Sequence, residues 1–195
     1  MKNYIISLIV RNDVMYDFIK IIIEAVGLSM DAFSLAILYG TLNFNNRKIL
    51  ALSTSVGLFH FFMPLLGNLI GMIVLKVLPI SPNIVVGVIF LIISIEMIVS
   101  LFKQDEVVDL KGMFAIILFA FTVSIDSFSV GIGLFTITSN SILAVSIFSL
   151  VSFSFTLVGL KVGGKLTDIF GKCSTLLGGI ILFLVSLFYL FFYTS

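Results

Sequence analysis

Two short motifs of the same pattern each place an aspartate inside a long apolar segment. They read Ser-Met-Asp-Ala-Phe-Ser at residues 29–34 and Ser-Ile-Asp-Ser-Phe-Ser at residues 124–129. Neither segment holds a lysine or arginine close to its aspartate, and a carboxylate at bilayer depth costs roughly 2.5–3.5 kcal/mol on insertion scales. Such a residue is by default a functional candidate. The matching contexts of Asp31 and Asp126 indicate a duplicated chain that carries a cation.

Each aspartate is followed three residues later, one helical turn on, by a serine: Ser34 after Asp31, and Ser129 after Asp126. A carboxylate beside a hydroxyl is an oxygen half-site, which suits hard or borderline divalent cations such as Mg²⁺ or Mn²⁺. We therefore expect these four residues to hold one dication between two facing half-sites. The alternative is that each aspartate is protonated and bonds a neighbouring helix.

Three further polar residues lie in apolar segments. Glu24, seven residues before Asp31, is a candidate relay between the outer surface and the centre, or a glutamate that snorkels to the interface. His60 is the only histidine; it could ligate a transition metal, accept a transported proton, or simply pack. Glu96 could line an inner vestibule or reach a polar loop.

The composition identifies an integral membrane protein. Apolar residues make up 60% of the 195 residues and charged residues 11%, with a mean hydropathy of +1.28. The net charge of +1 and the lack of a basic tract argue against nucleic acid as a partner. Cys173 is the only cysteine, which excludes an internal disulfide. No nucleophile–base pair, metalloprotease helix or phosphate loop is present, so we do not expect an enzyme.

The predicted fold is an all-α polytopic membrane protein of six transmembrane helices arranged as two inverted three-helix repeats. Residues 1–17 form an N-terminal extension, whose first fourteen residues would be absent from the protein if translation starts at Met15. The repeats cover residues 18–102 and 112–195, with a cytoplasmic linker at 103–111. The predicted spans are 18–41, 49–75, 83–102, 112–135, 141–160 and 174–193.

The repeat extends beyond the two aspartate motifs. At an offset of 92 residues, Pro64-Leu-Leu-Gly67 with Gly71 aligns with Thr156-Leu-Val-Gly159 with Gly163, and Gly87 aligns with Gly179. His60 then aligns with Ser152, whereas Glu24, at the 95-residue offset of the two aspartate motifs, aligns with Phe119 and lies outside the duplicated core. Inverted repeats place the substrate site near the membrane midplane, where the halves meet.

The basic residues predict the orientation, because cytoplasmic loops are enriched in lysine and arginine. The loops after the first, third and fifth helices hold Arg47, Lys48, Lys103, Lys111, Lys161, Lys165 and Lys172, against Lys2, Arg11, Lys20 and Lys76 on the other side. The odd-numbered loops are therefore expected in the cytoplasm and both termini outside.

Several stretches resemble the MntP family of bacterial manganese efflux pumps. They are the doubled aspartate motif, the run from Gly57 to Gly67 and the run from Phe119 to Gly131. The similarity covers roughly residues 20–192. It implies a six-helix Mn²⁺ exporter of the bacterial inner membrane, with essential aspartates matching Asp31 and Asp126 and a polar residue at the position of His60. Glu24 and Glu96 are not acids that this resemblance leads us to expect.

These observations together predict a secondary transporter for metal homeostasis that exports Mn²⁺ by rocking of one half against the other, with inward proton return as a natural way to reset the cycle. Mn²⁺ is its transported substrate, and no resident cofactor is expected. One alternative is export of another divalent metal or of a small cationic solute. Another is a non-transporting membrane scaffold or sensor. The sequence does not predict an oligomeric state.

Overall fold

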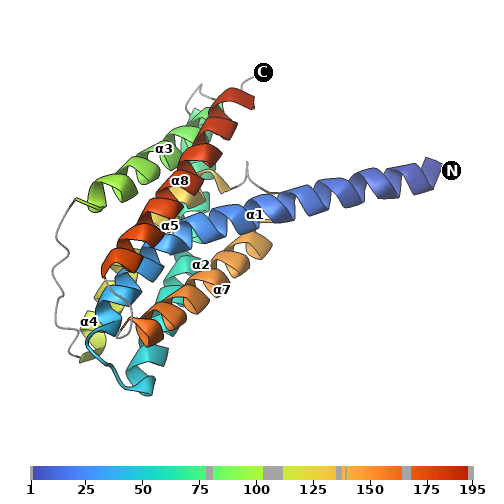
Figure 1. Ribbon diagram of the computed structural model, residues 1–195. Coiled ribbons are helices and arrows are strands. Elements are labelled where there is room, and N and C mark those ends of the chain that lie inside the picture. Colours follow the sequence, from blue (N-terminus) through green and yellow to red (C-terminus); the bar gives the residue numbers. More distant parts are fainter. Residues whose placement is uncertain are drawn as a thin grey trace.

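The computed structural model describes residues 2–77, 81–102, 112–134, 138, 140–163 and 168–192, with side chains for all of these except 2–14, 16, 74–75, 168–169 and 192. The regular structure in these ranges is helical (Figure 1). Its elements are α1 Lys2–Gly40, α2 Asn46–Val77, α3 Pro82–Ser100, α4 Gly112–Val123, α5 Ile125–Ile132, α7 Ser141–Val162 and α8 Asp168–Phe192.

Within the described residues, six helical segments are long and apolar enough to cross a membrane. They are Asp17–Gly40, Asn46–Ile73, Pro82–Ser100, Gly112–Ile132, Ser141–Val162 and Phe170–Phe191. The six predicted spans are confirmed to within a few residues at each end. The predicted extension is itself helical from Lys2 and continuous with the first span, and this part of α1 projects beyond the bundle in Figure 1. The predicted linker at 103–111 lies outside the described residues.

The fourth span differs from the prediction because it is interrupted. Helices α4 and α5 meet at Ser124, whose φ of −107° and ψ of 7° leave the α-helical region. The Ser124 amide donates to the Phe121 carbonyl, three residues back, at 3.1 Å. The second aspartate motif therefore begins on a helix break, whereas the first lies within the continuous helix α1.

The two halves interdigitate. Helix α1 packs on α7 and α8, α2 packs on α4, α5 and α7, and α3 packs mainly on α8. In the described part of the chain, no extensive contact joins two of the three helices α1, α2 and α3, or joins α7 to α8. Each half therefore buries its apolar surface against the other half.

The contacts between the halves come in reciprocal pairs. Between α3 and α8, the Ser94 hydroxyl donates to the Gly179 carbonyl at 3.0 Å, and the Ser186 hydroxyl donates to the Gly87 carbonyl at 2.8 Å. Both residues of the second bond follow from the first by the offset of 92 residues. This is the pattern that two copies related by a twofold axis produce.

The small-residue pairs of the sequence repeat behave in the same way. A Cβ atom added at Gly67 of α2 would overlap the Phe128 carbonyl of α5. A Cβ atom added at Gly159 of α7 would lie 2.9 Å from the Phe33 carbonyl of α1. These glycines let α2 approach α5 closely, and α7 approach α1 closely. Helices α2 and α7 therefore position the two aspartate motifs along the bundle.

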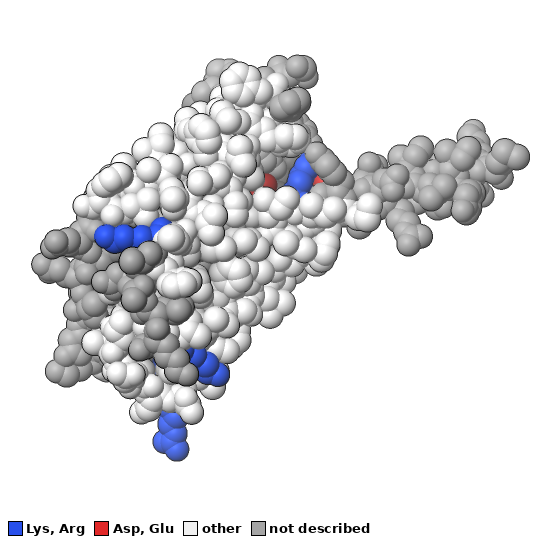
Figure 2. Space-filling model, viewed as in Figure 1, with Lys and Arg blue, Asp and Glu red and all other residues white. Residues whose placement is uncertain are grey.

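Charge is concentrated at the ends of the bundle. On the face shown in Figure 2, basic side chains gather at one end, and the broad surface between the ends is uncharged. At the other end, basic and acidic side chains lie in a hollow near the point where α1 leaves the bundle. This distribution fits a protein surrounded by lipid along its length.

Candidate cation site

A cavity of about 460 Å³ lies between α1, α3 and the broken helix α4–α5. It contains both motif aspartates together with other oxygen-bearing side chains. The polar lining residues are Asp31, Ser34, Glu96, Ser100, Thr122, Asp126, Ser129 and Thr175. Among the described residues, no lysine, arginine or histidine lines the cavity. The four residues predicted from the repeated motif, Asp31, Ser34, Asp126 and Ser129, therefore share one acidic cavity.

The two aspartates belong to facing helices and are both half-buried. Asp126 interacts electrostatically with Asp31 and with Glu96. One carboxylate oxygen of Asp126, Oδ1, accepts a hydrogen bond from the Ser127 amide at 2.8 Å. Because like charges gather here with no basic residue in the lining, a cation can offset their repulsion.

The helix break contributes to the same electrostatics. Thr122 and Val123, the last residues of α4, line the cavity beside Asp126 in the first turn of α5. The carboxyl end of a helix carries a partial negative charge, and broken helices in transporters use such ends to coordinate cations. The end of α4 thus adds to the field of the carboxylates.

The cavity extends toward one end of the bundle. On α3, its lining runs from Ile89 to Ser100, near the carboxyl end of that helix. Toward the other end, a Cβ atom added at Gly133 would overlap the Val86 side chain, so α3 and the fourth span are in contact there. The cavity therefore reaches toward the end that carries the loop after α3.

The corresponding contact between α1 and α8 is closed. A Cβ atom added at Gly178 of α8 would lie 2.9 Å from the Gly27 carbonyl of α1. At the offsets of the repeat, these two glycines correspond to Val86 and Thr122, and Thr122 lines the open cavity. Gly27 and Gly178 thus allow a close contact between α1 and α8, whereas the corresponding positions of the other half carry side chains.

His60 lies outside this cavity and is fully buried. Its Nδ1 is 2.9 Å from the Ser124 hydroxyl at the helix break and 3.1 Å from the Val56 carbonyl. The corresponding residues of the other half, Ser29 and Ser152, also form a hydrogen bond, at 2.7 Å. The structure thus places His60 as a support for the break rather than beside the aspartates.

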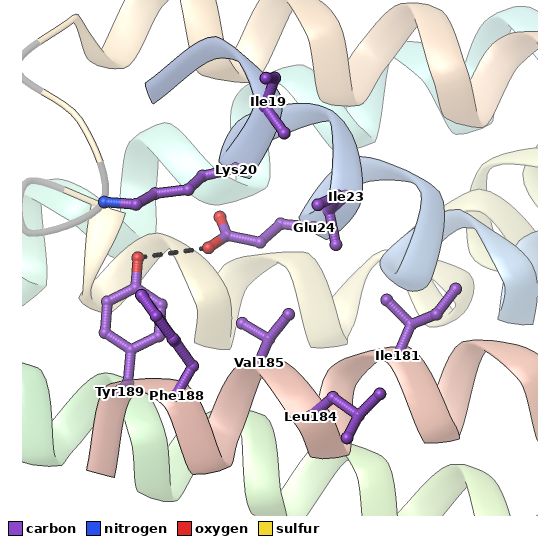
Figure 3. Close-up of a pocket in the computed structure, with 9 residues that line it drawn as sticks. All are labelled: Ile19, Lys20, Ile23, Glu24, Ile181, Leu184, Val185, Phe188 and Tyr189. Atoms are coloured by element: carbon purple, nitrogen blue, oxygen red, sulfur yellow. Dashed lines mark hydrogen bonds between the residues drawn. The ribbon is translucent and has the colours of Figure 1, made fainter. Parts of the chain in front are cut away.

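Glu24 also lies apart from the aspartates. It lines a second cavity, of about 370 Å³, between α1 and α8 (Figure 3). The Tyr189 hydroxyl donates to its Oε1 at 3.3 Å. Only 2% of Glu24 is exposed, so it does not snorkel to the interface.

The central cavity is not a ready-made metal cage. Among the described residues, no group of three His, Cys, Asp or Glu side chains is placed to hold a metal ion. The available donors are carboxylates and hydroxyls, which suit a cation that keeps part of its water. Sequence reasoning missed Ser100, Thr122 and Thr175, because isolated hydroxyls in apolar helices carry no spacing signal. The His60–Ser124 bond was not predicted either, although both residues have polar counterparts in the repeat.

The fold and the cavity define a multi-pass α-helical membrane protein with an acidic interior. A family model described as "Putative manganese efflux pump" (Mntp) matches residues 43–190. Proteins with this description and the name MntP are similar over most of their length. The one from Geobacillus thermodenitrificans is 36% identical over 176 residues, covering 90% of this chain and 96% of the relative. The one from Shouchella clausii is 32% identical over 169 residues, covering 86% and 94%.

The chain therefore belongs to the MntP family, which the residues of the two motifs had already suggested. No solved structure is a significant match to it.

Proposed function

We propose that this chain is a secondary transporter that exports Mn²⁺ from the cytoplasm across the bacterial plasma membrane. Its relatives are named as manganese efflux pumps. The observation that carries the proposal is the cavity in which Asp31, Asp126 and Glu96 meet, with no basic residue among the described part of its lining. Carboxylates and hydroxyls are ligands that Mn²⁺ accepts readily.

The ion enters from the side toward which the cavity extends. That side carries the loops after the first, third and fifth spans, where seven of the lysines and arginines lie, and such loops face the cytoplasm. Glu96, which is exposed and nearer the end of α3, raises the local concentration of cations. The ion then exchanges part of its water for Asp31 and Asp126, with Ser34 and Ser129 as further donors.

Release requires a change of packing between helices of different halves. Because the halves interdigitate, one half cannot rock as a rigid body against the other. We infer instead that α3 closes on α5 while α1 separates from α8. The repeat relates these two contacts, so the open contact becomes the closed one and the closed contact becomes the open one. The contact between α1 and α8, here called the α1–α8 seam, is held by Gly27 and Gly178. Its opening exposes the ion to the outside.

Replacing either aspartate by asparagine tests the site. Asp31→Asn and Asp126→Asn each remove one charge without changing shape, so everted membrane vesicles should lose Mn²⁺ accumulation while the protein still inserts. The content of Mn, Mg, Ca and Zn is resolved by element, which identifies the cargo. Ser146→Ala is a matched control, because its hydroxyl bonds only its own helix, at the Ile142 carbonyl. If both asparagine variants accumulate Mn²⁺ as the parent does, the proposal is wrong.

A further inference from the structure

Glu24 is a buried carboxyl group that the cation cavity does not use. Of its two oxygens, Oε1 accepts the Tyr189 hydroxyl, and Oε2 is buried with no hydrogen-bond partner. It faces a cavity of about 370 Å³ whose remaining lining, apart from Lys20, is aliphatic and aromatic. A buried carboxyl oxygen without a partner is costly, which calls for a ligand that satisfies it.

The position of this cavity links it to the opposite face of the membrane. Its lining residues lie toward the amino end of α1 and the carboxyl end of α8. They are therefore away from the end toward which the cation cavity extends. It lies along the α1–α8 seam, which must open for release under the proposed function. Glu24 precedes Asp31 by seven residues on the same helix, a rise of about 10 Å.

The chemistry of the cavity favours a proton over a metal ion. A dication needs several oxygen ligands, and here there are one carboxyl group and one phenol. Lys20 lines the same cavity, and its ammonium group would repel a second cation (Figure 3). A proton binds one oxygen covalently and needs no set of further ligands, and the cavity is large enough for water to accept a hydrogen bond from the resulting O–H group.

From this geometry we propose that Glu24 is the outer proton-binding site of the transporter, with Tyr189 as its positioning residue. The inference rests on the proposed Mn²⁺ export. A proton from outer water binds Oε2 while the Tyr189 hydroxyl continues to donate to Oε1. When the α1–α8 seam opens and Mn²⁺ leaves, water carries that proton to the emptied aspartate, and the Glu24 carboxylate is restored.

The titratable groups around Glu24 are few. On α1, Lys20 lies one turn away and forms an ion pair of 4.0 Å with Asp17. On α8, Tyr189 is the titratable residue of the lining. In the described part of the chain, neither α3 nor α7 brings such a group to this cavity. The ammonium of Lys20 and the phenol stabilise the carboxylate, and the apolar walls stabilise the acid, so both forms are accessible.

Everted vesicles, whose lumen corresponds to the outside, test the proposal. Radioactive Mn²⁺ uptake is measured with an acidic lumen and again after an ionophore collapses the pH gradient. Exchange of Mn²⁺ for Mn²⁺, which moves no net proton, is measured alongside. For Glu24→Gln we expect uptake to fall to the parent's level without a gradient, while exchange remains. Tyr189→Phe should weaken the response to the gradient, and Glu24→Asp should restore part of it.

Asp17→Asn is the matched control, because it removes a carboxylate of the same helix that lies outside the lining, and it should keep the response. The proposal is overturned if Glu24→Gln responds to the gradient as the parent does, if it loses Mn²⁺ exchange as well, or if parent uptake ignores the gradient. Each of these results would refute only the proton-binding role of Glu24, because the parent protein would still transport Mn²⁺. Failure of the parent to transport Mn²⁺ at all would instead refute the proposed function.

Discussion

Ser124 joins the helix break to the only histidine of the chain. Its hydroxyl lies 2.9 Å from His60 Nδ1 and donates to the Ala120 carbonyl at 2.8 Å. Both side chains are fully buried. A hydrogen bond of this kind contributes about 0.5–1.5 kcal/mol, and a buried partner left unsatisfied costs about 1–3 kcal/mol. The pair therefore stabilises the break that positions Asp126.

We expect Ser124→Ala and His60→Ala each to lower the unfolding midpoint of the purified protein. Because the two residues share one interaction, the double variant should lose less stability than the sum of the single losses. Because the break positions Asp126, both variants should also lower Mn²⁺ transport. The control for that measurement is the pair Ser29 and Ser152, which is bonded at 2.7 Å beside the continuous helix. Additive losses at His60 and Ser124 would contradict the coupling.

At the residue scale, the sequence predicted which aspartates share a cavity because the repeated motif and the cost of burying charge both identify them. The positions of Glu24 and His60 were not predictable. Their side chains face α8 and the helix break, and a spacing of seven residues on one helix does not reveal which neighbour a side chain meets. The metal-binding roles of the motif residues remain predictions.

The glycines of α2 set how closely that helix approaches α5. A Cβ atom at Gly67 would overlap the Phe128 carbonyl, which is backbone and cannot rotate away. Gly67→Ala must therefore push the two helices apart, and overpacking of this kind typically costs about 1–3 kcal/mol.

We expect Gly67→Ala to lower both the unfolding midpoint and Mn²⁺ transport, because α5 carries Asp126. Gly171→Ala is the control for thermal unfolding alone, since its Cβ would lie 3.3 Å from the Ser34 hydroxyl, which can rotate, and 3.5 Å from the Ser34 carbonyl. Equal behaviour of the two variants in thermal unfolding would show that the approach of α2 to α5 does not limit packing.

At the element scale, hydropathy predicted six spans because a helix needs about 20 apolar residues to cross the hydrocarbon core. The same signal could not predict the break at Ser124. The residues on both sides of it are apolar, and the same motif forms unbroken helix in α1. What differs is the tertiary partner, a histidine in one half and a serine in the other.

Alternating access through the α1–α8 seam makes a prediction for the whole molecule. A disulfide between Gly27→Cys and Ile181→Cys would hold the seam shut, because a Cβ at Gly27 lies 3.0 Å from the Ile181 side chain. Oxidation should stop Mn²⁺ transport and a reductant should restore it, in a Cys173→Ser background that removes the exposed native thiol.

The control disulfide joins α2 to α7, which are corresponding helices of the two halves. A Cβ at Gly57 would lie 3.0 Å from that of Phe153, which is shorter than the roughly 3.5–4.5 Å of a disulfide, so α2 and α7 must separate slightly to form the bond. Because this contact lies between equivalent helices, the exchange of conformations leaves it in place, and the oxidised control should still transport. Undiminished transport by the oxidised seam variant would exclude opening there.

At the scale of the molecule, the repeat predicted two halves but not their interdigitation. A sequence offset identifies equivalent residues and says nothing about which copy they contact. The reciprocal bonds of Ser94 and Ser186 show that the helices of each half pack against those of the other half. Rocking of intact halves, which the repeat alone suggested, does not suit this packing.

Interdigitation also determines when the protein can fold during its synthesis. The first three spans leave the ribosome before the helices on which they pack exist, so Ser29 and His60 enter lipid without their partners. Insertion must therefore precede folding. The amino-terminal half remains in the bilayer as separate helices until the second half has been made. A protein truncated after α3 should be degraded by quality-control proteases. Co-expression of the second half should restore the amount of the truncated protein.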